Sequence, residues 1–269
     1  MIGMFQYEFM QRALLAGVLE AVASGYFGAL VVQRGMGFLG SGLAHAAFGG
    51  VALGLFLGTD PLWVALPFTV AVALGITWVE RASMLASDTA IGVFFATSMA
   101  LGIVLLARTE GFQGDVGGYL FGSILAIGWM DVWAAAGCCA LAVATFPIWG
   151  RWAYATFDRE LATADRAPVR RDDYVLTVAL AVVVVVSLKV VGVVLAAAFL
   201  VIPAATSRLL VQTFRGMTLL AVVIGAVTAA AGVVASYPLD LPTGAAIVLL
   251  QAAIFLVVLA GAATSRRTQ

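Results

Sequence analysis

The chain has 269 residues, of which 63% are hydrophobic and only 10% are charged, and its mean hydropathy is +1.09. Soluble proteins carry about 25% charged residues, so this chain has too little polar surface to enclose a core in water. Its formal net charge is zero, which gives no reason to expect a nucleic-acid partner. The composition predicts an all-α, polytopic helical bundle in membrane lipid, with residues 1–269 forming a single transmembrane domain.

Two kinds of chemical motif are missing from the sequence. There is no GxxxxGK[ST] phosphate loop, so the chain is not expected to hydrolyse ATP itself. The only cysteines, Cys138 and Cys139, are adjacent and lie in an apolar segment, and we assign them neither a disulfide nor a metal site. No cofactor is expected to be tightly bound.

Apolar stretches follow one another along the whole chain, at about residues 12–33, 38–57, 62–79, 89–107, 128–150, 173–190, 193–211, 216–235 and 242–263. Residues 117–127 (GGYLFGSILAI) are too few to cross a bilayer and suit a re-entrant or broken helix. The stretches at 173–190 and 193–211 are so close together, with Gly192 between them, that they form either a tight hairpin or one irregular unit. We predict nine spans, with eight as the alternative.

The basic residues predict the orientation of the chain. If the N-terminus is outside and the C-terminus inside, three basic residues lie outside, at positions 12, 108 and 189, and eleven lie inside, at positions 34, 81, 151, 159, 166, 170, 171, 208, 215, 266 and 267. Lysine and arginine accumulate on the cytoplasmic side of membrane proteins. The bias predicts a multi-pass protein of the cytoplasmic (inner) membrane with this orientation.

One polar segment, residues 151–173, is long enough to form a helix outside the bilayer. The part at about residues 155–168 contains Phe157, Asp158, Glu160 and Ala162, and Asp158 is placed to cap a short helix. Either the segment is a solvated linker, or it is a docking element for a cytoplasmic partner. Its amphipathic character on an otherwise bare face favours docking.

His45 is the only histidine and lies inside a predicted span. Ionisable residues in a membrane usually face the bundle interior or a water-filled path. At helical spacing, His45 lies beside a stripe of small residues that lets helices approach closely, formed by Gly42, Ala46, Gly50, Gly54 and Gly58. The imidazole could hydrogen-bond a neighbouring carbonyl, or it could bind a divalent metal ion.

Six short motifs occur in a fixed order: RGMGFLGSGLAH (34–45), DTAIG (88–92), YLFGSIL (119–125), FDRELA (157–162), VGVVL (191–195) and LVIPAAT (200–206). In this order they resemble the segments G-D-x-L-[SA]-H, D-x-A-I-G, Y-L-F-G-x-I-L, F-D-x-E-x-A, V-G-x-L-L and L-[VL]-[IL]-P-A-A-T of the zinc/manganese-type ABC permease family. Each motif alone is weak, but the set is collinear from about residue 10 to residue 263 and is specific.

The resemblance implies a transport subunit and not an enzyme. It implies a homodimer, two cytoplasmic ABC ATPase subunits and an extracytoplasmic protein that delivers a zinc, manganese or iron(II) ion. It also implies that Phe157, Asp158, Glu160 and Ala162 belong to a helix that couples the permease to its ATPase. An ABC permease for a metal chelate or vitamin is the alternative. An intramembrane enzyme is disfavoured, because the sequence has no HExxH motif and no evident Ser/His dyad.

The chain departs from the family pattern at two positions. Ser41 occupies the place of the family aspartate four residues before His45, so the expected metal site is His45 with Ser41 and lacks a carboxylate. Arg166 occupies a place where the family tends to have glycine. Glu20 lies inside the first predicted span, and it is either protonated and hydrogen-bonded within the bundle or a source of negative charge for the ion path. Its different depth favours contact with the ion before or after His45, and not in one shared site.

Overall fold

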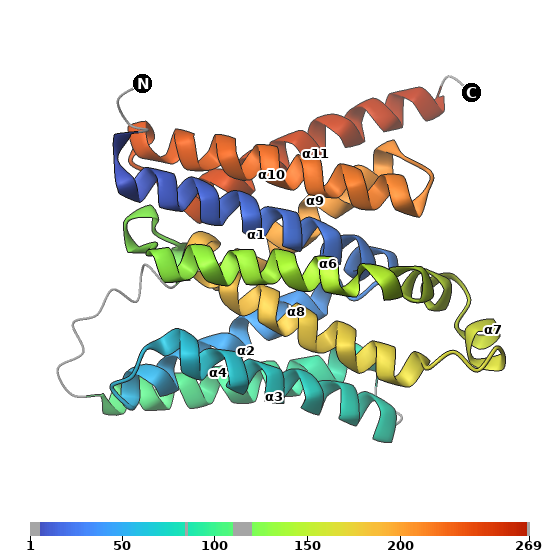
Figure 1. Cartoon of the computed structure of the whole chain (residues 1–269), viewed down its shortest axis with the longest axis horizontal. Helices are drawn as coiled ribbons and strands as arrows, with labels where there is room; N and C mark the ends of the chain where they lie inside the picture. Colours follow the sequence, from blue (N-terminus) through green and yellow to red (C-terminus); the bar gives the residue numbers. More distant parts are fainter. Residues whose placement is uncertain (1–5, 84–85, 110–119, 268–269) are drawn as a thin grey trace.

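The computed structural model describes residues 6–83, 86–109 and 120–267, which form a bundle of long helices (Figure 1). The helices are α1 (Glu8–Gln33), α2 (Gly37–Phe56), α3 (Pro61–Ala82), α4 (Ser87–Arg108), α6 (Trp129–Phe157), α7 (Arg159–Ala164), α8 (Val169–Val191), α9 (Ala196–Leu210), α10 (Phe214–Leu239) and α11 (Thr243–Arg267), with a 3₁₀ turn η2 (Ile124–Ala126). The predicted all-α class is confirmed.

Eight of the described helices are long and apolar enough to cross a membrane. The stretch predicted at 193–211 forms the shorter apolar helix α9, which has 15 residues. At about 1.5 Å per residue, such a helix is roughly 22 Å long and shorter than the hydrocarbon core of a bilayer. The nine predicted stretches therefore correspond to eight full-length spans and one short helix.

Three helices form the centre of the bundle: α1, α2 and α8 are mostly buried. Helix α1 packs chiefly on α10 and α6, whereas α2 packs chiefly on α4 and α3. Few residues of the outer helices α4 and α11 are buried, and their exposed side chains include the apolar Val93, Ile103, Val104, Leu256 and Val257. Such a surface suits lipid and not water.

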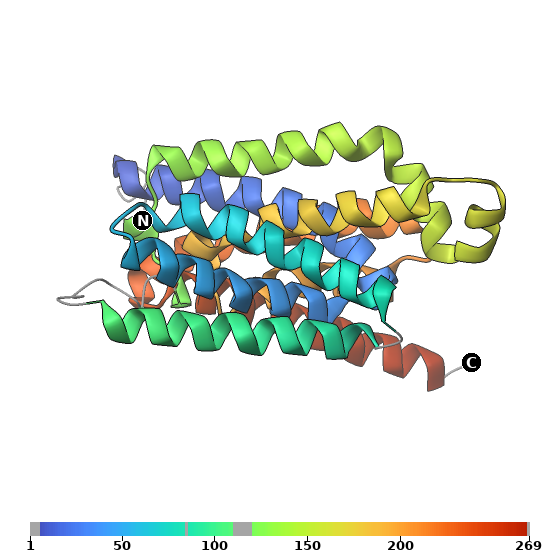
Figure 2. The ribbon, with the colours of Figure 1, turned by 90° about the horizontal axis from the view of Figure 1, so that it is seen from below.

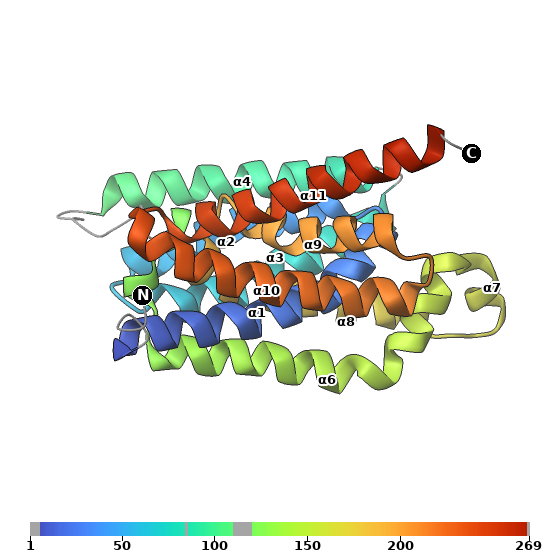
Figure 3. The same ribbon diagram turned by 90° about the horizontal axis from the view of Figure 1, so that it is seen from above.

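The two ends of the bundle differ. Helix α7 projects from one end, where α1, α3 and α6 also finish, and we call this the α7 end (Figures 1 and 2). Helix α1 begins at the opposite end, and α11 finishes toward the α7 end (Figure 3). The start of α1 and the end of α11 thus lie on opposite sides of the molecule, as expected if the two termini lie on opposite sides of the membrane.

Local sequence fixes where several helices begin. Asp60 accepts a hydrogen bond from the backbone nitrogen of Leu62 (2.9 Å) at the start of α3, and Thr213 accepts one from Gly216 (3.2 Å) at the start of α10. Asp131 accepts one from Gly128 (2.8 Å) at the start of α6 and also pairs with Lys189 (2.8 Å). A side-chain oxygen at these positions satisfies backbone donors that the helix leaves unpaired.

The end opposite α7 contains residues 120–128, an irregular segment that leads into α6. This segment lies against the turn that joins α8 to α9, and the backbone nitrogen of Val194 donates to the carbonyl of Leu120 (3.2 Å). Gly192 makes this turn with φ of +88°, a conformation that favours glycine. Helices α8 and α9 thus form a hairpin. The broken-helix prediction for 117–127 holds for its described part, whereas residues 117–119 lie outside the described residues.

Candidate functional site

The predicted small-residue stripe of α2 is a site of close helix packing. A Cβ atom at Gly50 would lie 2.6 Å from Cα of Ala65, and one at Gly54 would lie 2.7 Å from Cα of Pro61, both on α3. Any side chain at these two glycines would push α2 away from α3. The prediction that His45 lies beside a tightly packed face is confirmed, and the position of α2 is fixed by backbone contact.

Ser41 and His45 lie on the accessible stripe of this helix. Between Leu39 and Ala52, every residue is buried except Ser41 and His45, which are half-buried. The two residues are one helical turn apart and therefore point in the same direction. An otherwise buried apolar helix thus exposes its imidazole and its hydroxyl together.

The geometry of His45 determines which ring nitrogen remains available. Nδ1 of His45 lies 2.9 Å from the carbonyl oxygen of Ser41. A carbonyl can only accept, so Nδ1 of the neutral ring carries the hydrogen and Nε2 keeps its lone pair. The ring also packs edge-to-face on Phe95 of α4, with 4.9 Å between ring centroids. These two contacts fix the ring and leave Nε2 as an electron-pair donor.

Glu20 lies in a different part of the bundle. It is fully buried, and the thiol of Cys138 on α6 is the polar group beside its carboxyl. The adjacent Leu19 accepts a hydrogen bond through its carbonyl from Sγ of Cys139 (3.0 Å). Glu20 thus lies where α1 meets α6, whereas His45 lies where α2 meets α4, and the structure does not bring the two together.

The polar segment after α6 forms a short helix as predicted. Oδ1 of Asp158 accepts a hydrogen bond from the backbone nitrogen of Leu161 (2.8 Å), so Asp158 caps α7. Ala162 is buried in a small cluster with Ala155 and Val169. Phe157 is 62% exposed, and Leu161 is also exposed. The helix is therefore held to the bundle through Ala162 and presents apolar side chains outward.

The backbone conformation of Arg166 explains why glycine suits this position. Helix α7 ends in a Schellman motif: the nitrogen of Ala167 donates to the carbonyl of Ala162 (3.0 Å), and that of Arg166 donates to Thr163 (3.0 Å). The motif requires a left-handed residue, and Arg166 has φ of +57°. Glycine adopts this conformation without steric cost, whereas arginine does not.

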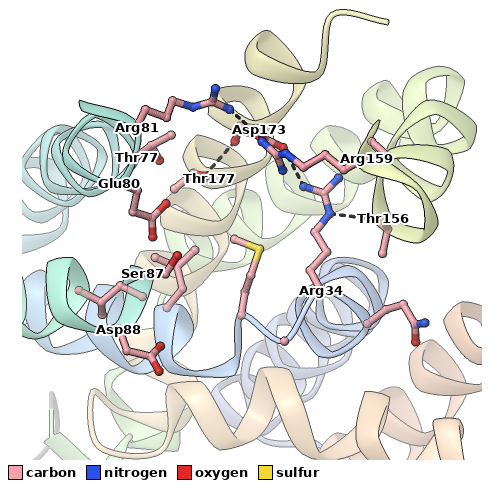
Figure 4. Close-up of a pocket in the computed structure, with 16 residues that line it drawn as sticks. Arg34, Thr77, Glu80, Arg81, Ser87, Asp88, Thr156, Arg159, Asp173 and Thr177 are labelled. Carbon is pink, nitrogen blue, oxygen red and sulfur yellow. Dashed lines mark hydrogen bonds and ion pairs between the residues drawn. The ribbon is translucent and has the colours of Figure 1, made fainter. Parts of the chain in front are cut away.

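A cavity of about 500 Å³ opens at the α7 end, lined by residues of α1–α4 and α6–α8 (Figure 4). A cluster of arginine side chains forms one wall, where Arg34, Arg81 and Arg159 all bind the carboxylate of Asp173. Burial lowers the pKa of the Arg34 guanidinium from its usual value, and Asp173 opposes this shift. Glu80 and Asp88 line the same cavity, which is therefore polar.

Comparison with known proteins identifies the family. A family model described as the ABC 3 transport family matches residues 6–262. The chain belongs to the ABC 3 transport family.

Relatives of this family member match it over nearly its whole length. An uncharacterized membrane protein of Synechocystis is 38% identical over 97% of this chain and 93% of its own. The manganese transport system membrane protein MntC of Listeria innocua is 36% identical over 95% of this chain and 91% of its own. The solved structure of PsaBC from Streptococcus pneumoniae in complex with Fab is 32% identical and superposes with a TM-score of 0.85, covering 95% and 92% of the two chains. The predicted resemblance to metal-type ABC permeases is confirmed.

The sequence did not predict the arginine cluster of this ABC 3 family member. Its residues are spread from position 34 to position 173, and no motif connects them. One signal was present: Asp172 and Asp173 directly follow a basic stretch that the charge bias places at the same end as Arg34 and Arg81. Two carboxylates among so many arginines indicate ion pairs, but their partners cannot be read from spacing.

Proposed function

We propose that this chain is the membrane-spanning permease subunit of an ABC importer that moves a divalent transition metal ion across the cytoplasmic membrane. Within the proposal, the chain forms a homodimer, two ABC ATPase subunits bind at the α7 end, and an extracytoplasmic binding protein delivers the ion to the opposite end. The N-terminus is then outside and the C-terminus inside. Family membership supports the transport class, and the MntC relative supports manganese as the first ion to test.

The accessible pair on α2 is the observation that carries the metal assignment. The bundle buries this helix on all sides but one, and it exposes the single histidine with Nε2 free. Imidazole nitrogen binds zinc, iron and other late divalent ions, while hydroxyl and water oxygens suit harder ions such as manganese. Ser41 and His45 can therefore make a loose, partly hydrated contact with such an ion, as transit requires.

One subunit offers too few ligands to hold an ion alone. Within residues 6–83, 86–109 and 120–267, no group of three or more His, Cys, Asp or Glu side chains is placed to bind a metal. A second copy of the chain, with its own His45 and with water, would complete the coordination shell. This requirement supports the proposed homodimer, with the accessible stripe of α2 facing the partner copy.

Helix α7 is the proposed docking element for the ATPase. Its buried side, at Ala162, fixes it to the bundle, and Phe157, Asp158 and Glu160 are exposed. Phe157 also packs edge-to-face on Phe214 at the start of α10, with 5.7 Å between ring centroids. A partner that moves α7 would thereby act on α6, α8 and α10.

The experiment that tests the proposal is ion uptake by the complete complex in proteoliposomes. The permease, its ATPase and its binding protein are reconstituted, and ATP-dependent uptake of manganese, zinc and iron(II) is compared between wild type and His45→Gln. Glutamine keeps a polar side chain but removes the imidazole, so we expect uptake to fall about tenfold while the ATPase stays bound. Full uptake by the variant would exclude His45 from the ion path. If the wild-type complex took up an added metal chelate but none of the three free ions, the substrate would belong to the chelate class instead.

Glu20 is a second candidate group within this proposal. A buried acidic residue inside a membrane marks a functional position by default. Glu20→Gln preserves shape and removes the charge. Lower uptake with normal assembly would assign Glu20 to the ion path, whereas unchanged uptake would confine it to the packing of α1 on α6.

A further inference from the structure

One carboxylate at the α7 end binds three arginines from three separate elements (Figure 4). Asp173, near the start of α8, accepts from Nη1 of Arg34 on Oδ1 (2.9 Å). Its Oδ2 accepts from Arg81 at the end of α3 (2.5 Å) and from Arg159 at the start of α7 (2.6 Å). Asp173 therefore connects α3, α7, α8 and the turn between α1 and α2.

The three ion pairs differ in burial. The side chains of Arg34 and Asp173 are 9% and 13% exposed, whereas that of Arg159 is 58% exposed. Partly buried ion pairs are screened little by solvent, and exposed ones are screened strongly. The cluster therefore has a firm inner pair, Arg34 with Asp173, and a weaker outer arm that reaches α7.

Arg34 makes further bonds that fix the turn before α2. Its Nε donates to Oγ1 of Thr156 (2.8 Å), and its Nη2 donates to the carbonyl of Trp152 (3.3 Å), both near the end of α6. Helix α2 starts three residues after Arg34, at Gly37. The turn that leads into the helix carrying Ser41 and His45 is thus joined to the two helices that flank α7.

We propose that Asp173 and Arg34 are positioning residues that transmit movement of α7 to α2. This inference rests on the proposed function, in which the ATPase moves α7. The covalent chain leads from α7 only into α6 and α8. The ion-paired route is different, because it runs from Arg159 through Asp173 to Arg34 and reaches the start of α2 directly.

The cavity gives this route a second consequence. Arg34, Arg81, Arg159 and Asp173 all line it. A displacement of α7 that pulls Arg159 from Asp173 alters this wall and loosens the hold on Arg34 at the same time. The cluster thus links the position of α7 both to the cavity at this end and to the helix that bears His45.

A neighbouring ion pair supplies a matched control. Arg151 of α6 binds Asp172, the residue before Asp173, with bonds of 2.8 and 3.1 Å, and its side chain is 46% exposed. Arg151→Ala and Arg159→Ala thus each remove a half-exposed arginine from adjacent aspartates of α8. Among the described residues, Asp173 and not Asp172 is also ion-paired to the α1–α2 turn, through Arg34, and to α3, through Arg81.

The test measures ions transported per ATP hydrolysed by the reconstituted complex, together with the amount of ATPase bound. We expect Arg159→Ala and Asp173→Asn to lower this ratio about tenfold with the ATPase still bound. Arg151→Ala and Arg159→Lys should keep the ratio of the wild type, since the first leaves the cluster intact and the second keeps the positive charge. Arg159→Ala alone tests the route if Asp173→Asn does not fold.

Three results would overturn the inference. An unchanged ratio in Arg159→Ala would show that α7 acts on α2 by another route. An equal fall in Arg151→Ala would show a general weakening of the α7 end, and loss of ATPase from Arg159→Ala would make Arg159 a docking residue. Absence of metal uptake by the wild-type complex would instead overturn the proposed function, and the route with it.

Discussion

Replacing Arg166 by glycine should stabilise helix α7. Arg166 occupies the left-handed position that ends the helix, with φ of +57°, and two hydrogen bonds hold it there, Arg166 N to Thr163 O and Ala167 N to Ala162 O, both 3.0 Å. The bonds belong to the backbone, so glycine retains both of them. What glycine removes is the clash between Cβ and the adjacent carbonyl.

The size of the effect follows from two opposing terms. The left-handed conformation costs an L-residue with a side chain about 1–2 kcal/mol. Glycine loses more conformational entropy on folding, which costs about 0.5–1 kcal/mol. The net gain in stability is about 0.5–1 kcal/mol. Because α7 has only six residues and opens locally, this gain raises the free energy of opening α7 and not that of unfolding the whole bundle.

Hydrogen exchange of the backbone amides of residues 159–165 measures this gain. A stabilisation of that size slows exchange about two- to fivefold where exchange requires opening of α7. Arg166→Ala is the matched control, because it removes the same charge and long side chain but keeps Cβ. Equal protection in the alanine and glycine variants would show that the charge and not the backbone conformation destabilises the helix, and would refute this reasoning.

Three further predictions concern the path, the docking helix and the packing. Ser41→Asp places a carboxylate one turn from His45, where the family has its aspartate. A unit charge pair at about 4 Å gains about 4 kcal/mol near a protein surface, and desolvation of the charges offsets most of this gain. We therefore expect metal uptake to reach half-saturation at an about tenfold lower ion concentration, which the neutral variant Ser41→Asn should not produce. The double variant Asp158→Arg, Glu160→Arg removes the cap of α7 and reverses two exposed charges. ATP-coupled uptake should therefore fall more than about tenfold, while unchanged tryptophan fluorescence shows that the bundle remains folded. Persisting uptake with bound ATPase would exclude α7 as the docking element. Gly28→Ala brings a Cβ against the carbonyl of Leu200 on α9 and should lower the stability measured by thermal unfolding by about 1–3 kcal/mol. Gly137→Ala on α6 is the control, because nothing lies within 4 Å of the added Cβ, and it should leave the stability unchanged or raise it. An equal loss of stability in both variants would contradict the argument that Gly28 permits close helix approach.

Much of the architecture was predictable from the sequence because it depends on local properties. The apolar stretches gave the spanning helices, since an isolated helix satisfies its own backbone in lipid. Asp158 predicted the start of α7, and the glycine stripe beside His45 predicted close packing of α2, because capping and helical spacing act over a few residues. The ordered motifs were sufficient to indicate the family.

The tertiary structure decided what depends on distant residues. Glu20 and His45 belong to different helix pairs, and only the packing of α1 on α6 and of α2 on α4 separates them. Arg34 and Asp173 are 139 positions apart, and their ion pair exists because α1 finishes and α8 begins at the same end of the bundle. The sequence by itself determined which segments are helices and which side chains are candidate metal ligands, because these follow from composition and local spacing. Only the fold determined which charges meet, because ion pairs between helices depend on packing geometry, which local sequence does not encode.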